Sequence, residues 1–204
     1  MKLEDFKLFK EIKPDIYVKN FKVINYNKED MVFNEGDICQ HLSFVLEGSV
    51  SIRTYSLNGK EEIINTVTPG NIFGDILCYS KNNKYIGHVI ADKNTTIAHI
   101  HKDIWTNIIQ ENKTILINFI SLITEKTFKT KMENKILSHK NIEDRIYYYL
   151  NTHFDNKKNN IVTIKNVTEL AKILNLPRPS VSRTLSTMEG KGLIKRNKNR
   201  IEVL

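Results

Sequence analysis

The 204-residue chain has few of the features that mark secreted or membrane proteins. Its only two cysteines, Cys39 and Cys78, are far apart and show no Cys-x-x-Cys spacing. A disulfide framework and a cysteine-based zinc or iron–sulfur site are therefore excluded, and both thiols are expected to be reduced. No stretch approaches about eighteen uninterrupted apolar residues, and the N-terminus has no apolar signal region. We expect a cytoplasmic protein without a membrane partner.

Low-complexity segments are also absent, and the 40% apolar and 26% charged residues are typical of a globular protein. The charge is unevenly distributed. Residues 1–138 contain 18 basic and 17 acidic side chains, whereas the last 66 residues contain 13 and 6. A basic module attached to a nearly neutral one is expected of nucleic-acid binding, because phosphate contacts supply most of the sequence-independent affinity. The charge asymmetry by itself is explained equally well by a basic surface that only keeps the protein soluble.

The first half of the chain is rich in short β-type segments. From about Phe21 to Ile100, runs of Val, Ile, Phe, Leu and Thr are separated by turn residues and show no helical period. Asn58-Gly59 is a strong hairpin signal between Val50–Leu57 and Glu62–Val67. Strands at this spacing predict a β sandwich or jelly roll.

A long amphipathic helix is predicted to follow. Apolar residues recur at three- and four-residue intervals from Asp103, and neither proline nor glycine occurs through Asp144. About thirty helical residues would extend roughly 45 Å, which is more than a small barrel needs to cover it. The surplus length favours a helix–helix dimer seam through Leu116, Ile120 and Ile123. The alternative is that the apolar face of this helix only packs against its own domain and forms no dimer contact.

A second domain is expected to begin after Ser138. The segment 138–141 interrupts the apolar period, and Asn141 followed by two acidic residues is typical of a helix N-cap. A helix from Ile142 to Phe154 and a polar loop over residues 155–160 are predicted next. The chain therefore divides into an effector-sensing β-roll domain (1–110), a dimerisation helix (111–138) and a C-terminal domain (139–204).

The segment Val167–Leu185 contains two helical periods separated by a tight turn, which is the pattern of a helix-turn-helix. Asn175 suits a turn position of positive φ, and Pro179 fits only the first turn of the second helix. Arginine can donate two hydrogen bonds to guanine in the major groove, and serine can donate or accept. The residues at the exposed start of the second helix, predicted to read bases, are Arg178, Ser182 and Arg183.

The segment Lys191–Val203 has the pattern of a strand, a basic turn and a second strand, as in the wing of a winged helix. Its cations are expected to hold phosphate rather than to read sequence. The residues predicted to contact the DNA backbone are Ser180, Lys191, Lys195, Arg196 and Lys198. A helix-turn-helix can also be purely architectural, but the wing and the charge asymmetry favour DNA binding.

The whole chain resembles the Crp/Fnr family of bacterial transcription regulators. The segments that carry the resemblance are Phe33–Asp37, Phe44–Val50, Pro69–Asp75, Asp144–Ile146, Leu176–Arg183 and Met188–Ile194. The resemblance implies an α+β fold with an N-terminal β jelly roll of the cyclic-nucleotide-binding type, a long dimerisation helix and a C-terminal winged helix-turn-helix. It also implies a homodimer that binds palindromic double-stranded DNA, works with RNA polymerase and is not an enzyme. Many family members have Glu where this chain has Pro179, so its operator is expected to differ at that base pair.

Family members that bind cyclic AMP are similar in a phosphate cassette, Phe-Gly-Glu-Leu followed by a loop and Arg-Ser or Arg-Thr. Here Phe73–Ile76 matches the first half, but Tyr85 and Ile86 stand where the Arg and its hydroxyl partner would be, and Lys84 is the only nearby cation. Because a buried phosphate without its Arg is poorly compensated, we expect an unidentified small-molecule effector other than cyclic AMP. The predicted effector pocket comprises Phe73, Gly74, Asp75, Tyr85 and Ile86.

Other sensing chemistries stay open. The cysteine cluster of the iron–sulfur branch of the family is absent, because no cysteine precedes Cys39. The sequence requires no cofactor, yet a haem or thiol-based redox sensor is an alternative, as is a cupin-type metalloenzyme tethered to DNA. The cupin spacing Gly-x5-His-x-His is missing, and a regulator without any ligand is the last possibility. The candidate haem ligands or redox thiols are Cys39, His41, Cys78, His88, His99 and His101.

Overall fold

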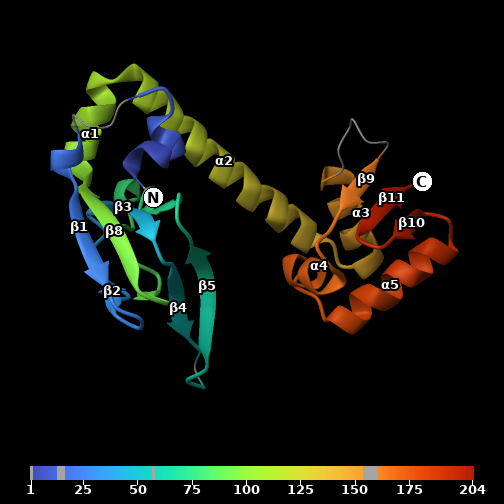
Figure 1. The fold of residues 1–204 in the computed structure, drawn as a ribbon. Coiled ribbons are helices and arrows are strands. Elements are labelled where there is room, and N and C mark those ends of the chain that lie inside the picture. Colours follow the sequence, from blue (N-terminus) through green and yellow to red (C-terminus); the bar gives the residue numbers. More distant parts are fainter. Residues whose placement is uncertain (1, 13–16, 57, 154–159) are drawn as a thin grey trace. The chain divides into compact units, whose positions relative to one another are not determined.

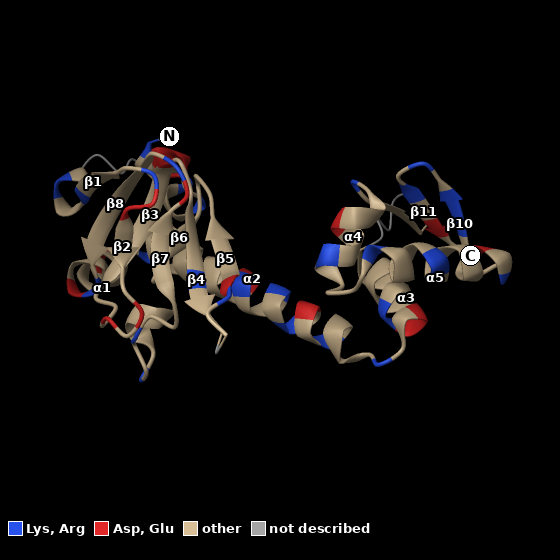
Figure 2. Ribbon diagram, turned by 90° about the horizontal axis from the view of Figure 1, so that it is seen from below, with Lys and Arg blue, Asp and Glu red and all other residues tan. Residues whose placement is uncertain are grey.

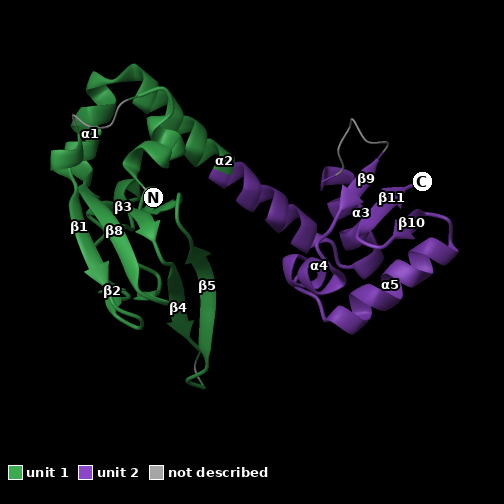
Figure 3. Ribbon diagram, in the orientation of Figure 1, with its two compact units in different colours: residues 1–125 green, residues 126–204 purple. Residues whose placement is uncertain are grey.

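The computed structural model describes residues 2–12, 17–56, 58–153 and 160–204, and Figure 1 shows their elements. The chain divides into two compact units, Met1–Glu125 (unit 1) and Lys126–Leu204 (unit 2), as coloured in Figure 3. The boundary between them falls inside helix α2 (Lys113–Ser138), so each unit contains part of this helix. The three-part division at residues 110 and 138 stays a prediction.

Unit 1 is built on two four-stranded antiparallel sheets whose inner faces share one core. Their strand orders are β1-β8-β3-β6 and β2-β7-β4-β5. The strands are β1 (Lys22–Tyr26), β2 (Met31–Phe33), β3 (His41–Glu47), β4 (Val50–Tyr55), β5 (Glu61–Val67), β6 (Ile72–Phe73), β7 (His88–Ala91) and β8 (Thr95–His101). Short 3-10 helices are η1 (Leu3–Asp5), η2 (Lys7–Phe9), η4 (Val18–Asn20) and η5 (Leu77–Tyr79). The predicted β jelly roll is confirmed.

The predicted hairpin between β4 and β5 is also confirmed. Gly59 takes φ +75°, a left-handed conformation that glycine adopts without a Cβ clash. The backbone N–H of Ser56 donates to the carbonyl of Lys60 at 2.9 Å and closes the turn. Leu57, which was expected to end the first strand, lies outside the described residues.

Aromatic side chains fill the end of the β roll that α1 (Lys102–Glu111) covers. Trp105 on α1 is completely buried, and its ring packs edge-on against Phe9 and Phe44 at 6.2 Å and against Phe119 at 5.6 Å. Phe9 comes from the N-terminal segment, to which the sequence analysis gave no role. The N-terminal residues, the sheets and both helices thus share one apolar core.

The prediction of one uninterrupted helix from Asp103 was wrong. The structure has two helices, α1 and α2, separated at Asn112, whose backbone is extended at φ −126° and ψ 100°. The Asn112 side chain accepts from the backbone N–H groups of Thr114 and Ile115, both at 3.1 Å, and so caps α2. A capping side chain can therefore end one helix and begin another without proline or glycine.

In its described residues, unit 2 contains three helices besides its share of α2, and a three-stranded sheet of order β10-β11-β9. Its elements are α3 (Ile142–His153), β9 (Ile161–Thr163), α4 (Val167–Ile173), α5 (Arg178–Gly190), β10 (Ile194–Asn197) and β11 (Arg200–Val203). The predicted cap of α3 is present, because Asn141 Oδ1 accepts from Glu143 N at 3.0 Å. Phe154 and most of the predicted polar loop lie outside the described residues.

The two units together form the predicted α+β arrangement of a β roll, a long helix and a winged helix-turn-helix. Among the described helices, none has the length and apolar character needed to cross a membrane.

Candidate nucleic-acid interface and sensing pocket

The two helices α4 and α5 form the predicted helix-turn-helix. Asn166 caps α4 by accepting from Glu169 N at 2.8 Å, and Asn175 takes φ +50° in the turn, as its position predicts. The turn closes where Leu176 N donates to the carbonyl of Ala171 at 2.9 Å. Pro179 lies in the first turn of α5, where its missing N–H leaves no unpaired donor.

The first turns of α5 present the predicted base readers. Arg178 and Arg183 are exposed, and Ser182 is half-buried. Arg178 and Ser182 are four residues apart, which places them on the same side of the helix. Arg183 Nε makes one long hydrogen bond, 3.4 Å, to the carbonyl of Pro179. Both guanidinium groups are therefore free of acidic partners among the interactions in the described chain, as groups that donate to guanine must be.

Lys and Arg positions lie along the β10–β11 hairpin (Figure 2), and the predicted backbone-contacting cations differ in their partners. Lys195 and Lys198 are exposed, and Lys198 takes φ +51° in the β10–β11 turn. Lys191 Nζ instead lies 2.8 Å from a carboxylate oxygen of Glu143, and Arg196 lies 2.7 Å from Glu189. The hydrogen bonds from Arg196 lower the pKa of the Glu189 carboxyl. Lys191 and Arg196 must therefore share their charge between an acid of unit 2 and any phosphate.

Ser180, the remaining predicted backbone contact, is half-buried next to Pro179. Its backbone N–H donates to the carbonyl of Pro177 at 3.0 Å. Ser180, the third residue of α5, thus supports the first turn of the helix with its backbone.

Arg145 on α3 has a structural role that the sequence analysis did not assign. Its guanidinium donates to three carbonyls, those of Leu137 at 3.0 Å, His139 at 2.7 Å and Leu174 at 3.1 Å. These carbonyls lie at the C-terminal ends of α2 and α4, where the helix leaves them without partners. Arg145 therefore joins the ends of two helices within unit 2. The segment Asp144–Ile146 carried part of the family resemblance and was the available signal.

Replacing Arg145 with lysine should destabilise unit 2 by about 2 kcal/mol, because a single ammonium cannot reach three carbonyls in a fixed fork. Urea unfolding followed by circular dichroism measures the change. Arg200→Lys is the matched control, since Arg200 is exposed on β11 and should lose under about 0.5 kcal/mol. Equal stability of the two variants would contradict the assigned role.

The residues of the predicted effector pocket differ in how deeply they are buried in unit 1. Phe73 and Tyr85 are both 5% exposed, and the Tyr85 ring stacks on Phe33 with centroids 4.7 Å apart. Gly74 has φ +77°, and a Cβ there would collide with the carbonyl of His41. Asp75 is buried, whereas Ile86 is 64% exposed. Three of the five predicted pocket residues are therefore buried, Gly74 is half-buried and Ile86 lies at the surface.

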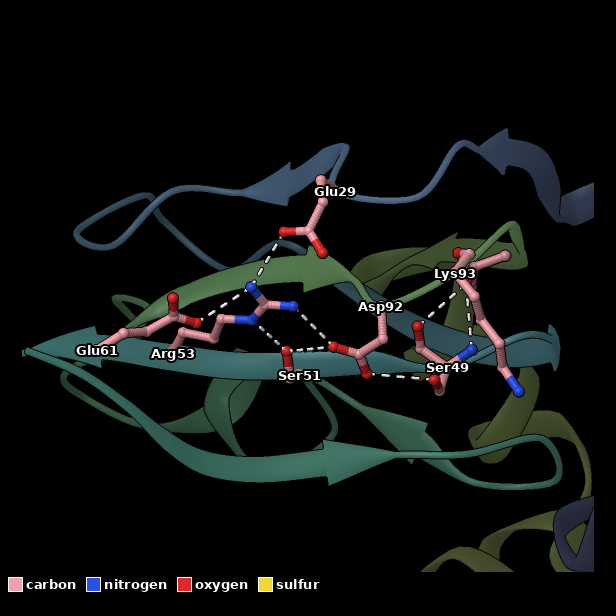
Figure 4. A network of polar contacts seen from close by, with 8 residues as sticks. Glu29, Ser49, Ser51, Arg53, Glu61, Asp92 and Lys93 are labelled. Atoms are coloured by element: carbon pink, nitrogen blue, oxygen red, sulfur yellow. Dashed lines mark hydrogen bonds and ion pairs between the residues drawn. The ribbon is translucent and has the colours of Figure 1, made fainter.

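A free arginine for a cyclic phosphate is missing from unit 1. Its sequence contains one arginine, Arg53 on β4, with a side chain that is 11% exposed. Figure 4 shows the guanidinium held by carboxylates of Asp92 at 2.9 Å, Glu61 at 3.0 Å and Glu29 at 3.1 Å. Although burial acts in the opposite direction, hydrogen bonds from Ser51 and Arg53 lower the pKa of Asp92. The Arg53 network therefore ties loops and strands together and leaves no guanidinium for a phosphate.

The candidate haem-binding histidines of unit 1 have structural partners. His99 on β8 is 6% exposed, with Nδ1 2.8 Å from Ser43 Oγ and Nε2 3.1 Å from Tyr26 Oη. His101 Nδ1 accepts from Asp103 N and caps α1. The other two are His41, edge-on to His101 at 5.3 Å, and His88, whose Nδ1 accepts from Glu35 N at 3.3 Å. Within the described ranges, no group of three or more His, Cys, Asp or Glu could hold a metal ion.

Stability should depend on pH through His99. Burial, with smaller contributions from the charges of His41 and Lys22, lowers the pKa of His99 to about 4. The unfolded chain takes up this proton near pH 6.5, so the stabilising effect of the neutral ring is complete above pH 6.5. It falls by about 3 kcal/mol as the pH drops to about 4. Urea midpoints between pH 7.5 and 4 should fall more steeply for wild type than for His99→Gln, and parallel curves would contradict the role of His99.

The two cysteines, far apart in sequence, meet in unit 1 with their Sγ atoms 3.4 Å apart. Cys39 is fully buried and Cys78 is 3% exposed. Both were expected to be separate, reduced thiols, and nothing in their spacing indicates that they pair. Their proximity results from the β-roll topology, which brings the start of β3 beside η5.

Comparisons with known proteins agree with these two modules. Residues 23–112 match the family model of the cyclic nucleotide-binding domain, and residues 144–204 match that of the Crp-like helix-turn-helix domain. The chain is 22% identical over 189 residues to the Cyclic AMP receptor protein of Thermus thermophilus, covering 93% of this chain and 87% of the relative. It is 24% identical to the cAMP-activated global transcriptional regulator Vfr of Pseudomonas aeruginosa, with 83% of each chain covered.

The solved structure of the Thermus thermophilus catabolite activator protein has the same fold. It superimposes with a TM-score of 0.58 at 22% identity, covering 97% of this chain and 93% of that one. At this identity the likeness supports the fold, while the residues of each site must be judged from this chain itself.

Proposed function

Because the chain belongs to the Crp/Fnr family of transcription regulators, we propose that it acts as a homodimer on palindromic operators and responds to an effector other than cyclic AMP. It is a DNA-binding regulator with a Crp-like helix-turn-helix. The observation that carries the proposal is the exposed start of α5, where Arg178 and Arg183 have no acidic partners among the described interactions. Arg178, Ser182 and Arg183 read bases, and Lys195 and Lys198 hold phosphates.

Two recognition helices of a homodimer would enter successive major grooves about 34 Å apart. A fluorescence-anisotropy titration of palindromic fragments with half-sites one helical turn apart tests this arrangement. We expect two chains per fragment and tighter binding than to a fragment whose half-site spacing is changed by five base pairs. Equal affinity for both fragments and for random DNA would contradict palindromic recognition.

The dimer seam is proposed to run along α2 through Leu116, Ile120 and Ile123. Ile120 is 54% exposed and supports this role, whereas Leu116 and Ile123 are half-buried and Ile123 packs partly against the core of unit 1. Ile117 and Phe128 are exposed on the same helix, at 51% and 64%. An apolar surface of this kind is expected to be covered in the assembled protein.

Light scattering of Ile120→Glu tests the seam. A charge in an apolar interface should convert the dimer to a monomer, because the desolvated carboxylate would find no partner. Lys129→Glu is the control, since it places a carboxylate at an exposed polar position nine residues from Ile120, on the opposite side of α2, and should leave the dimer intact. A monomeric wild type, or a dimeric Ile120→Glu, would contradict the proposed seam.

An effector other than cyclic AMP is supported by the stacked Tyr85 in the cassette and by the engaged guanidinium of Arg53. Isothermal titration with cyclic AMP at millimolar concentration should give no saturable heat. Saturable binding with a dissociation constant below about 100 μM would overturn this part of the proposal and leave DNA recognition untouched.

RNA polymerase is the expected protein partner of a regulator of this family. Neither a haem nor a cupin-type metal centre is favoured by a specific observation.

A further inference from the structure

Cys39 and Cys78 touch inside unit 1 although 39 positions separate them in the sequence. Cys39 lies two residues before the start of β3, and Cys78 is the central residue of η5. Backbone hydrogen bonds fix both positions, because Cys39 N donates to Asn83 O at 2.7 Å and Cys78 N donates to Gly74 O at 2.9 Å. The two thiols therefore face each other without any rearrangement of the sheets.

The geometry is close to that needed for a covalent bond. The Sγ atoms are 3.4 Å apart, and a disulfide requires about 2.05 Å, so side-chain rotation must bring them roughly 1.4 Å closer. Both side chains are enclosed, at 0% and 3% exposure, and the turn formed by residues 80–82 beside them is exposed. An oxidant not much larger than water can reach the thiols after a small opening of that turn. A bulky oxidant requires a much larger displacement of the turn and should therefore react more slowly.

The two thiols are electrostatically unequal. The hydrogen bond from Cys78 is the largest influence on Cys39 and, with the contact to Tyr85 Oη at 3.3 Å, outweighs burial and lowers the pKa of the Cys39 thiol to about 7. The hydrogen bond to Cys39, together with burial, raises the pKa of the Cys78 thiol. The lowered pKa favours the thiolate of Cys39 over that of Cys78, and the thiolate is the form that attacks an oxidant.

We propose that Cys39 and Cys78 form a hydroperoxide-reactive dithiol that closes reversibly to an intramolecular disulfide. The Cys39 thiolate attacks one oxygen of hydrogen peroxide, the O–O bond breaks, and the departing hydroxide takes a proton to give water and Cys39 sulfenic acid. The Cys78 sulfur then attacks the sulfenic sulfur, an S–S bond forms, and the sulfenic oxygen leaves with the thiol proton as a second water. Overall, two thiols and one peroxide give one disulfide and two waters.

Tyr85 connects this dithiol to the cassette segment. Its hydroxyl contacts Cys39, and its ring stacks on Phe33 in the interior that the proposed effector would have to enter. Oxidation removes the Cys39 thiol from that contact and would change the lining of the pocket. This last consequence rests on the proposed function, whereas closure of the disulfide does not.

Intact-mass analysis of the full-length protein tests the proposal. The reduced protein is treated with hydrogen peroxide at pH 7, then unfolded and alkylated with N-ethylmaleimide. We expect a loss of two hydrogens, no alkylation, a Cys39–Cys78 linked peptide, and complete reversal by dithiothreitol. Two alkylated thiols after peroxide, a disulfide between chains, or a stable sulfinic acid would each overturn the proposal. Oxidised glutathione should react at least tenfold more slowly, and equal rates would overturn the assignment of a hydroperoxide.

Three variants separate the roles of the groups. Cys78→Ala should accumulate a Cys39 sulfenic acid that dimedone traps, and Cys39→Ala should leave Cys78 at least tenfold less reactive. Tyr85→Phe keeps the ring on Phe33 but removes the hydroxyl, so the pH at which oxidation reaches half its maximal rate should move upward. An unchanged pH profile would remove Tyr85 from the scheme, and equal reactivity of the two cysteines would overturn the order of attack. The intact-mass measurement on the wild-type protein tests disulfide formation directly, so the main proposal can be tested even if a variant folds poorly.

Discussion

Replacing both Arg178 and Arg183 with alanine is expected to remove most of the discrimination between operator and random DNA. Each arginine that donates two hydrogen bonds to guanine contributes about 1–3 kcal/mol of discrimination. Loss of both should therefore weaken operator binding by roughly 30-fold to 10⁴-fold. Both side chains are exposed at the start of α5, so the fold of unit 2 should not change. Anisotropy titrations of operator and random fragments at one fixed salt concentration measure the effect.

Two controls separate base reading from the loss of charge. Lys195→Ala removes an exposed cation of the wing and should weaken operator and random DNA alike, while reducing the salt slope by about 1. Lys60→Ala removes an equal charge from the β4–β5 turn of unit 1 and should have little effect on either fragment. If the double arginine variant weakened both fragments equally, its arginines would be phosphate contacts and the proposed readers would have to be sought elsewhere.

Local signals were sufficient for most of the DNA-binding module. Pro179 has a fixed φ and no N–H, and Asn175 tolerates positive φ, so these residues predicted the start of α5 and the position of the turn, and the structure confirms both. The wing followed in the same way from its strand–turn–strand pattern. Strand β9 was not predicted, although the β-branched run at Ile161–Ile164 was an available signal.

Tertiary contacts decided what the sequence could not indicate. The break at Asn112 depends on a side-chain cap that competes with helix continuation, and asparagine inside a helical period does not by itself show which conformation prevails. The meeting of Cys39 and Cys78 depends on long-range strand order, as does the capture of Arg53 by three carboxylates. The family resemblance indicated that a phosphate-binding Arg was missing, but the stack of Tyr85 on Phe33 in its place depends on a tertiary contact between distant strands and loops.

Trp105→Ala should destabilise unit 1 by about 3–5 kcal/mol, the largest stability effect expected of a single substitution in this chain. The indole is fully buried between the N-terminal segment, β3 and α2, where its ring contacts Phe9, Phe44 and Phe119, so its removal leaves a cavity that three anchored rings cannot fill. Because Trp105 is the only tryptophan, urea unfolding must be followed by far-ultraviolet circular dichroism.

Trp105→Phe distinguishes the contribution of ring packing from that of the indole N–H. Within the described residues, Trp105 Nε1 is buried without a hydrogen-bond partner, so phenylalanine removes an unpaired donor while keeping most of the aromatic contact. The expected cost is about 1 kcal/mol, well below that of alanine. Ile104→Ala, at a neighbouring position that is 40% exposed, should cost less than either. A phenylalanine variant as unstable as the alanine one would mean that the Nε1 proton has a partner, most simply a buried water, and that the N–H stabilises the core as much as the ring does.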